Sequence, residues 1–197
     1  VVQTSPAGTY EISDIRRIDG WLFFDRDGYS SDSIFIEWNN RKIVSNEIFL
    51  NTEPMLDSLE FYSIVVNRFQ TAQIYQIVVR ADIFDFEGVN DIDSVFIMNE
   101  QLNVKSLLQF NSLSGFYERT LGLADLRIED LNQVIGKDFN LVVTDLDGRE
   151  FTVANTFIKR VINEEIELIS PINSAVVSFP FTLRWKRFTP GFDFYYA

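Results

Sequence analysis

Short apolar runs, each bounded by turn residues, follow one another along almost the whole chain. The runs are rich in Phe, Ile and Val, which favour the pleated, half-buried surface of a sheet, and Asp, Asn, Gly, Ser and Pro separate them. Runs of this length with turns every 8–12 residues are typical of all-β sandwiches. The expected strands cover residues 10–16, 21–25, 33–38, 42–50, 58–66, 74–84, 94–98, 104–110, 117–121, 139–144 and 150–160. The chain is therefore expected to be all-β.

One segment departs from the strand pattern. In LADLRIEDLNQVIGKD, apolar residues recur at a spacing closer to a helical period than to two. Gly136 follows at a position suited to ending a helix. We expect a short helix or helical turn over 128–135, a crossover between two strands that leaves the fold class unchanged.

Two acidic loops of similar sequence lie 60 residues apart. FFDRDGYSSDSIFI covers 23–36, and IFDFEGVNDIDSVFI covers 83–97 with one extra residue in its loop. We interpret the two segments as equivalent corners of separate sandwiches. A third acidic segment, Asp145–Gly148, has the spacing of a tight hairpin, in which Gly148 supplies a positive φ.

Two stretches resemble domains of exported bacterial proteins. FYSIVVNRFQTAQIYQIVVRADIFDFEGVNDIDSVFI resembles the first strands of immunoglobulin-like domains in bacterial surface proteins and lipoproteins. IELISPINSAVVSFPFTLRW is similar to the opening of a fibronectin type III-like domain. The resemblance implies tandem β-sandwiches: an abbreviated β domain over 1–55, an immunoglobulin-like sandwich over 56–163 with the short helix, and an incomplete fibronectin type III-like domain over 164–197. It also implies export to the periplasm, outer membrane or cell surface, with a lipid anchor upstream of Val1 as one arrangement.

Charge and composition exclude several classes of function. The chain has 29 acidic and 17 basic residues and a net charge of −12, so phosphate backbones and anionic lipids are repelled and no nucleic-acid partner is expected. Without Cys or His, the chain has no disulfide, no thiolate or His-ligated metal site, and no His-based catalytic triad. No apolar run reaches the length of about 18 residues that a transmembrane helix needs.

The acidic loops leave two interpretations open. In an immunoglobulin-like sandwich the second and sixth strands end at the same end of the domain, which would gather carboxylates from two loops. Ca²⁺ prefers six to eight oxygen ligands, so calcium is one possible ligand. The other interpretation is turn chemistry alone, since Asp bonds its own backbone and Gly turns the chain. The candidate metal ligands are Asp85, Glu87, Asp91, Asp145 and Asp147.

The pattern favours a non-catalytic structural or protein-interaction module that binds a protein partner or a neighbouring subunit. Acids at hairpin tips are solvated and stay ordinary carboxylates, which argues against an enzyme. The alternative is a carbohydrate-binding accessory module, whose exposed aromatic rings would stack on sugars. Trp21 and Trp185 lie in strand patterns and are expected in cores, whereas Trp38, beside polar residues, is expected at the surface. A sugar binder should expose at least two coplanar aromatic rings on one face.

Overall fold

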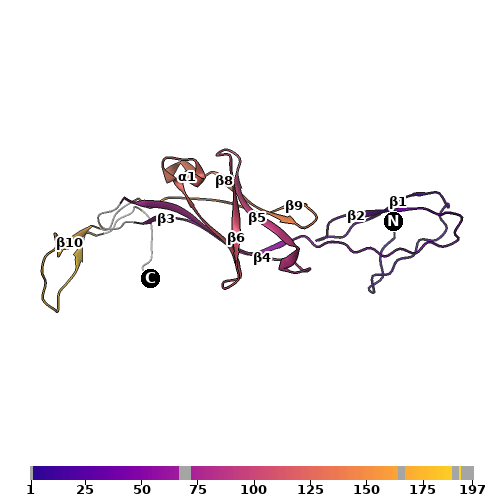
Figure 1. Ribbon diagram of the computed structural model, residues 1–197, viewed down its shortest axis with the longest axis horizontal. Helices are drawn as coiled ribbons and strands as arrows, with labels where there is room; N and C mark the ends of the chain where they lie inside the picture. Colours follow the sequence, from indigo (N-terminus) through magenta and orange to yellow (C-terminus); the bar gives the residue numbers. More distant parts are fainter. Residues whose placement is uncertain (1, 67–71, 164–166, 188–190, 192–197) are drawn as a thin grey trace. The chain divides into compact units, whose positions relative to one another are not determined.

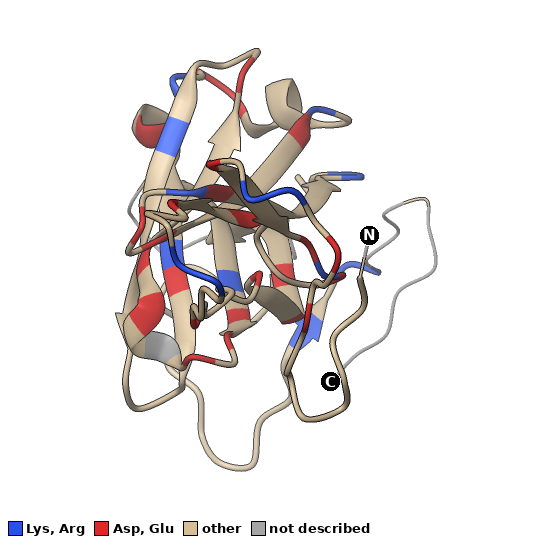
Figure 2. Cartoon of the chain, turned by 90° about the vertical axis from the view of Figure 1, so that its right-hand side faces the viewer, with Lys and Arg blue, Asp and Glu red and all other residues tan. Residues whose placement is uncertain are grey.

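The computed structural model describes residues 2–66, 72–163, 167–187 and 191. The chain divides into two compact units, Val1–Glu53 and Pro54–Ala197, which are drawn in Figure 1. Acidic positions occur throughout both units, with the fewer basic ones between them (Figure 2). The predicted division into three domains stays a prediction, and each unit is described by itself below.

The first unit is built around one two-stranded antiparallel ribbon. Strand β1 (Gly20–Phe24) pairs with β2 (Asp32–Ile36), and the loop between them is held by residues 51–53 through the amide of Ser30 and the carbonyl of Gly28. No strand forms over 10–16 or 42–50, so those two predictions are wrong. A run with strand propensity forms a strand only when a neighbour satisfies its backbone groups, and these runs pair with no ladder among the described residues.

The second unit contains a seven-stranded sheet in which every pairing is antiparallel. Its order is β3-β4-β7-β6-β5-β8-β9, so all-β is confirmed. The sequence predicted all seven strands. Their bounds are β3 Met55–Val66, β4 Ile74–Phe84, β5 Ile92–Asn99, β6 Val104–Asn111, β7 Phe116–Gly122, β8 Asp138–Asp145 and β9 Glu150–Phe157.

The sheet curls because β6 is shared between two halves. Residues Val104–Leu108 of this strand pair with β5, and Gln109–Asn111 pair with β7. In Figure 1, β6 crosses the direction of β3 steeply. The curl brings Phe61 of the first strand in the order against Phe139 of the sixth, with ring centroids 5.1 Å apart. One half therefore packs over the other.

The core lies between these two halves. One half contributes Ile77, Val79 and Leu121, and the other contributes Val95, Ile97, Phe139, Leu141 and Val143, all fully buried. Alternate residues of β4 are buried from Ile77 to Ile83, as the pleat of a strand with one face on the core requires. The connection between β7 and β8 closes one end of the core with Leu126, Ile128, Leu131 and Val134.

The predicted helix over 128–135 is wrong in its extent. The connection contains one turn of α-helix, α1 (Leu123–Leu126), and a 3₁₀ turn, η2 (Leu131–Val134). Arg127 separates them with φ 55°, a left-handed conformation that ends a right-handed helix. The Asp130 side chain then accepts a hydrogen bond of 2.8 Å from the amide of Asn132 and caps η2. Gly136 follows with φ 70°.

A second ribbon follows the large sheet. Strand β10 (Leu168–Ser170) pairs with β11 (Arg184–Trp185), and every residue of both strands is exposed. Ile158, directly after β9, forms a parallel bridge with Ile135, the residue that follows η2. Neither α1 nor the 3₁₀ turns of the described residues are long and apolar enough to cross a bilayer.

Candidate functional site

The best-defined group of carboxylates lies in the loop that follows β4. Asp85 comes directly after the strand, and its Oδ1 accepts a hydrogen bond of 2.9 Å from the amide of Glu87. The amide of Gly88 donates to the carbonyl of Asp85, and the amide of Asp91 donates to the carbonyl of Gly88, both at 3.0 Å. These bonds wind the loop into a turn and then into η1 (Val89–Asp91), which leads into β5.

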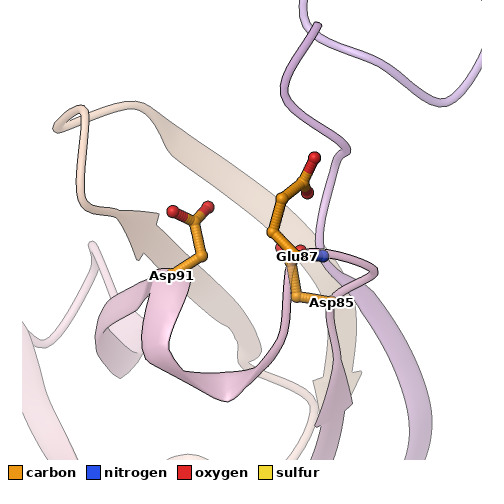
Figure 3. Close-up of side chains that lie close together, drawn as sticks. All are labelled: Asp85, Glu87 and Asp91. Carbon is orange, nitrogen blue, oxygen red and sulfur yellow. The ribbon is translucent and has the colours of Figure 1, made fainter. Parts of the chain in front are cut away.

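The winding gathers three acidic side chains. One carboxylate oxygen each from Asp85, Glu87 and Asp91 lie within 4.8 Å of one another. Figure 3 shows Asp85 and Glu87 on one arm of the loop and Asp91 on the other. Asp85 is buried, Asp91 is half-buried and Glu87 is exposed. Oxygens this close can reach a single cation, since Ca²⁺ ligands lie about 2.3–2.6 Å from the ion.

The β8–β9 hairpin lies beside this loop, as the sequence predicted. Ile92 pairs with Asp145, and the amide of Leu146 donates to the carbonyl of Asp91 at 3.0 Å. The two loops therefore adjoin at one end of the sheet. Their adjacency is a consequence of the pairing of β5 with β8, which carries both loops to the same edge of the core.

The two acidic residues of the hairpin, Asp145 and Asp147, interact with Arg149 of the same hairpin. Asp145 is only 2% exposed, and its Oδ1 accepts a hydrogen bond of 2.8 Å from the amide of Arg149. Asp147 is exposed and lies 3.8 Å from the Arg149 guanidinium. Neither belongs to the group of three among the described residues. The structure thus brings together three of the five predicted metal ligands and uses Asp145 to close a turn.

Asp85 and Asp145 make equivalent hydrogen bonds in their turns. Each precedes a glycine by three residues, accepts that glycine's amide at its backbone carbonyl, and accepts a later amide at its side chain. Gly88 and Gly148 have φ 98° and 80°, which glycine adopts without the strain that a Cβ imposes. Turn chemistry therefore accounts for the Asp-x-x-Gly spacing in both loops.

The first acidic loop is built differently, so the interpretation of two equivalent corners is wrong. Its strands, β1 and β2, pair directly with each other, whereas β4 and β5 pair with other strands and never with each other. Gly28 has φ 78°, but its carbonyl accepts the amide of Glu53 rather than an amide of its own loop. The two similar local sequences therefore lie in loops with different hydrogen bonds and different strand pairing.

The aromatic residues of the β1–β2 ribbon form a second candidate, of which the sequence had indicated Trp21 as a possible sugar-stacking residue but not Phe23 or Phe35. Trp21, Phe23 and Phe35 are 61%, 75% and 48% exposed, and we call them the ribbon face. Trp21 pairs with Phe35 across the strands, with centroids 5.4 Å apart and ring planes 64° apart. The expectation that Trp21 and Trp185 are buried is wrong, as is exposure of Trp38, which is half-buried.

Trp21 and Phe23 lie two positions apart in a strand and therefore share a face, which was expected in a core because apolar faces of strands are usually covered. In this unit the cover is lacking. Thr52 is the one residue of the first unit that is buried among those described. An uncovered aromatic face of this kind marks an interaction site more often than a scattered surface residue does.

Comparisons with known proteins offer no template for either candidate. No protein-family model, curated protein or solved structure matches this chain.

Proposed function

We propose that this chain is a non-catalytic interaction module of an exported bacterial protein and that it binds a protein partner through the ribbon face. The single observation that carries the proposal is the exposure of Trp21, Phe23 and Phe35 on one face of the β1–β2 ribbon. Aromatic residues supply large contact areas at protein interfaces, and their burial is strongly favourable. A water-exposed group of three is costly unless a partner covers it.

The proposed fold of the second unit is an immunoglobulin-like sandwich. Its two half-sheets run β3-β4-β7-β6 and β5-β8-β9. With the strands lettered A to G in chain order, this order is ABED and CFG, the arrangement of constant-type immunoglobulin domains. Such modules are used as spacers and as binding domains. The sequence resemblance to bacterial surface proteins supports a place in the periplasm, outer membrane or cell surface.

A carbohydrate-binding module is the alternative. The exposed aromatic rings favour it, since sugar binders stack sugars on such rings. The ring planes of Trp21 and Phe35 stand 64° apart, however, whereas a platform for sugar rings needs coplanar aromatic groups. The edge-to-face pair forms an uneven apolar surface in place of a flat platform, which suits packing against the side chains of a protein, and the protein partner is therefore preferred.

The test compares the intact chain with a Trp21→Ala/Phe35→Ala variant. Both are immobilised and exposed to envelope proteins of the source cells, and bound proteins are identified by mass spectrometry. We expect at least one protein that the intact chain retains and the double variant loses. A Leu113→Ala variant, altered at a 98% exposed apolar residue of the second unit, is the matched control. Equal retention by all three chains, or binding to a glycan array that depends on Trp21, would refute the proposal.

A further inference from the structure

The β10–β11 ribbon presents a second uncovered apolar face. The residues around it carry a net charge opposite in sign to that of the residues around the ribbon face. Leu168 pairs directly with Trp185 across the two strands, so their side chains lie on the same face. They are 47% and 54% exposed. Arg184, Lys186 and Arg187 are exposed beside them. Lys186 forms an ion pair with Glu167, while no ion pair to Arg184 or Arg187 occurs within residues 167–187.

The charges around the two ribbons are complementary. Residues 19–37 contain five acids and one base, a net charge of 1 − 5 = −4. Residues 167–187 contain three bases and one acid, a net charge of 3 − 1 = +2. Asp19 and Asp25 directly precede and follow β1, and both are exposed. The aromatic ribbon thus has carboxylates directly before and after β1, and the second ribbon has arginines on both sides of Trp185 along the chain.

We propose that the two ribbons bind each other between copies of this chain, so that the β10–β11 face of one copy covers the ribbon face of the next. Trp185 and Leu168 would pack on Trp21, Phe23 and Phe35, and Arg184 and Arg187 would meet the carboxylates around β1. Arginine suits both contacts, because its guanidinium stacks on aromatic rings and pairs with carboxylates. Opposite charges at the edges also set the orientation and disfavour contacts between two identical ribbons.

The surfaces that meet are different, so the contact is heterologous. A heterologous contact that does not close into a ring adds copies head to tail. Because the contact combines a small apolar area with exposed ion pairs, it weakens as salt screens the charges. Self-association rests on the proposed interaction role and makes a second copy of the chain the partner. Its absence would leave binding to a different protein possible.

Association of the purified full chain is measured by sedimentation velocity over a range of protein concentrations. We expect the mean mass to rise with concentration, and the apparent dissociation constant to increase at least tenfold between about 0.1 M and about 1 M NaCl, as the screening length falls from about 10 Å to about 3 Å. A chain that stays monomeric at every concentration in low salt overturns the proposal.

Charge reversal tests the pairing of the two ribbons. Asp25→Lys/Asp27→Lys makes the first ribbon basic, and Arg184→Glu/Arg187→Glu makes the second acidic. We expect each variant alone to remain monomeric and an equimolar mixture of the two to associate. Glu100→Lys/Glu129→Lys is the control for the first variant, because it makes the same change in net charge at exposed positions outside both ribbons, and it should associate like the unaltered chain.

The outcomes separate the two proposals. Failure of the mixture to associate, with each variant still folded by circular dichroism, rules out pairing of the two ribbons. If the chain is monomeric but an envelope protein is retained only when Trp21 and Phe35 are present, self-association fails and the interaction role remains. If neither association nor retention depends on these aromatic residues, both proposals fail.

Discussion

The amide of Leu146 donates a hydrogen bond of 3.0 Å to the carbonyl of Asp91, and this bond ties together two acidic loops that lie more than 50 residues apart in sequence. It connects the β8–β9 hairpin to the loop containing Asp85 and Glu87.

Asp145 is expected to stabilise the hairpin, not to bind metal. Asp145→Ala removes the acceptor of the Arg149 amide in a buried position, which should lower the free energy of unfolding by about 1–3 kcal/mol. Asp145→Asn keeps an acceptor oxygen and should cost less. Urea denaturation measures both. Asp147→Asn, at an exposed position, is the control and should have little effect. A loss in Asp147→Asn equal to that in Asp145→Ala would contradict the assignment.

Substitution of Glu87 distinguishes the calcium interpretation of this loop from the turn interpretation. Its side chain belongs to the group of three carboxylates, and its backbone amide donates to Asp85 in the turn. We expect the turn interpretation to hold, so that the thermal unfolding midpoint is the same in calcium and in EDTA. A site holding calcium at 100 times its dissociation constant would instead add about 2.7 kcal/mol.

The Glu87→Gln variant makes that comparison specific. A midpoint that rises with calcium in the unaltered chain and not in Glu87→Gln would show that calcium binds at this loop. Asp147→Asn is again the control, since its carboxylate is outside the group. A rise that survives Glu87→Gln would place any calcium elsewhere.

Gly148 is expected to be needed for its backbone conformation and not for its size. A Cβ at this position would meet no atom within 4 Å, but φ is 80°. Gly148→Ala should therefore destabilise the second unit by about 1–2 kcal/mol, the cost of a left-handed conformation for a residue with a Cβ. Gly148→Asn should cost less, because Asn tolerates this region better.

Gly122 provides the comparison for Gly148. Its φ of −84° is accessible to any residue, and an added Cβ would meet only the Asp125 side chain, at 3.7 Å. Gly122→Ala should change the free energy of unfolding by about 0.5 kcal/mol or less. Equal losses from the two alanine substitutions would show that φ is not the cause.

Tyr117 is expected to make the second unit sensitive to alkali. Burial raises the pKa of the Tyr117 phenol above its ordinary value of 10.0, because desolvation disfavours the phenolate. The unfolded chain therefore ionises at lower pH than the folded one. The associated stability is complete below about pH 10 and is lost as the pH rises from there through the folded pKa.

Tyr117→Phe should flatten this alkaline loss. The measurement is the free energy of unfolding from about pH 8 to about pH 11, a range that includes the ordinary pKa of a tyrosine. Tyr62→Phe, at a 44% exposed tyrosine of β3, is the matched control for the loss of a phenol hydroxyl. Identical profiles for Tyr117→Phe and the unaltered chain would contradict the prediction.

Local sequence carried most of the information about strands in the second unit. β4 has the bounds predicted from its apolar run, 74–84, because the strand preference of β-branched residues and the flanking turn residues act over a few positions. The turns were equally local: Asp145 and Gly148 specify theirs through bonds within five residues. The same local signals could not distinguish the β1–β2 hairpin from the β4–β5 crossover, since both loops read as acid-x-x-Gly.

What the sequence determined by itself was therefore the all-β class, the strand positions of the second unit and the turn residues between them. Only the tertiary structure decided which faces are covered. Trp21 and Phe139 both lie in apolar runs that form strands, yet Trp21 is exposed while Phe139 packs against Phe61 and is fully buried. Burial depends on whether another layer of structure lies opposite, and that is a property of strands far apart in sequence. The gathering of Asp85, Glu87 and Asp91 within 4.8 Å likewise required the loop's folded path in addition to its residues.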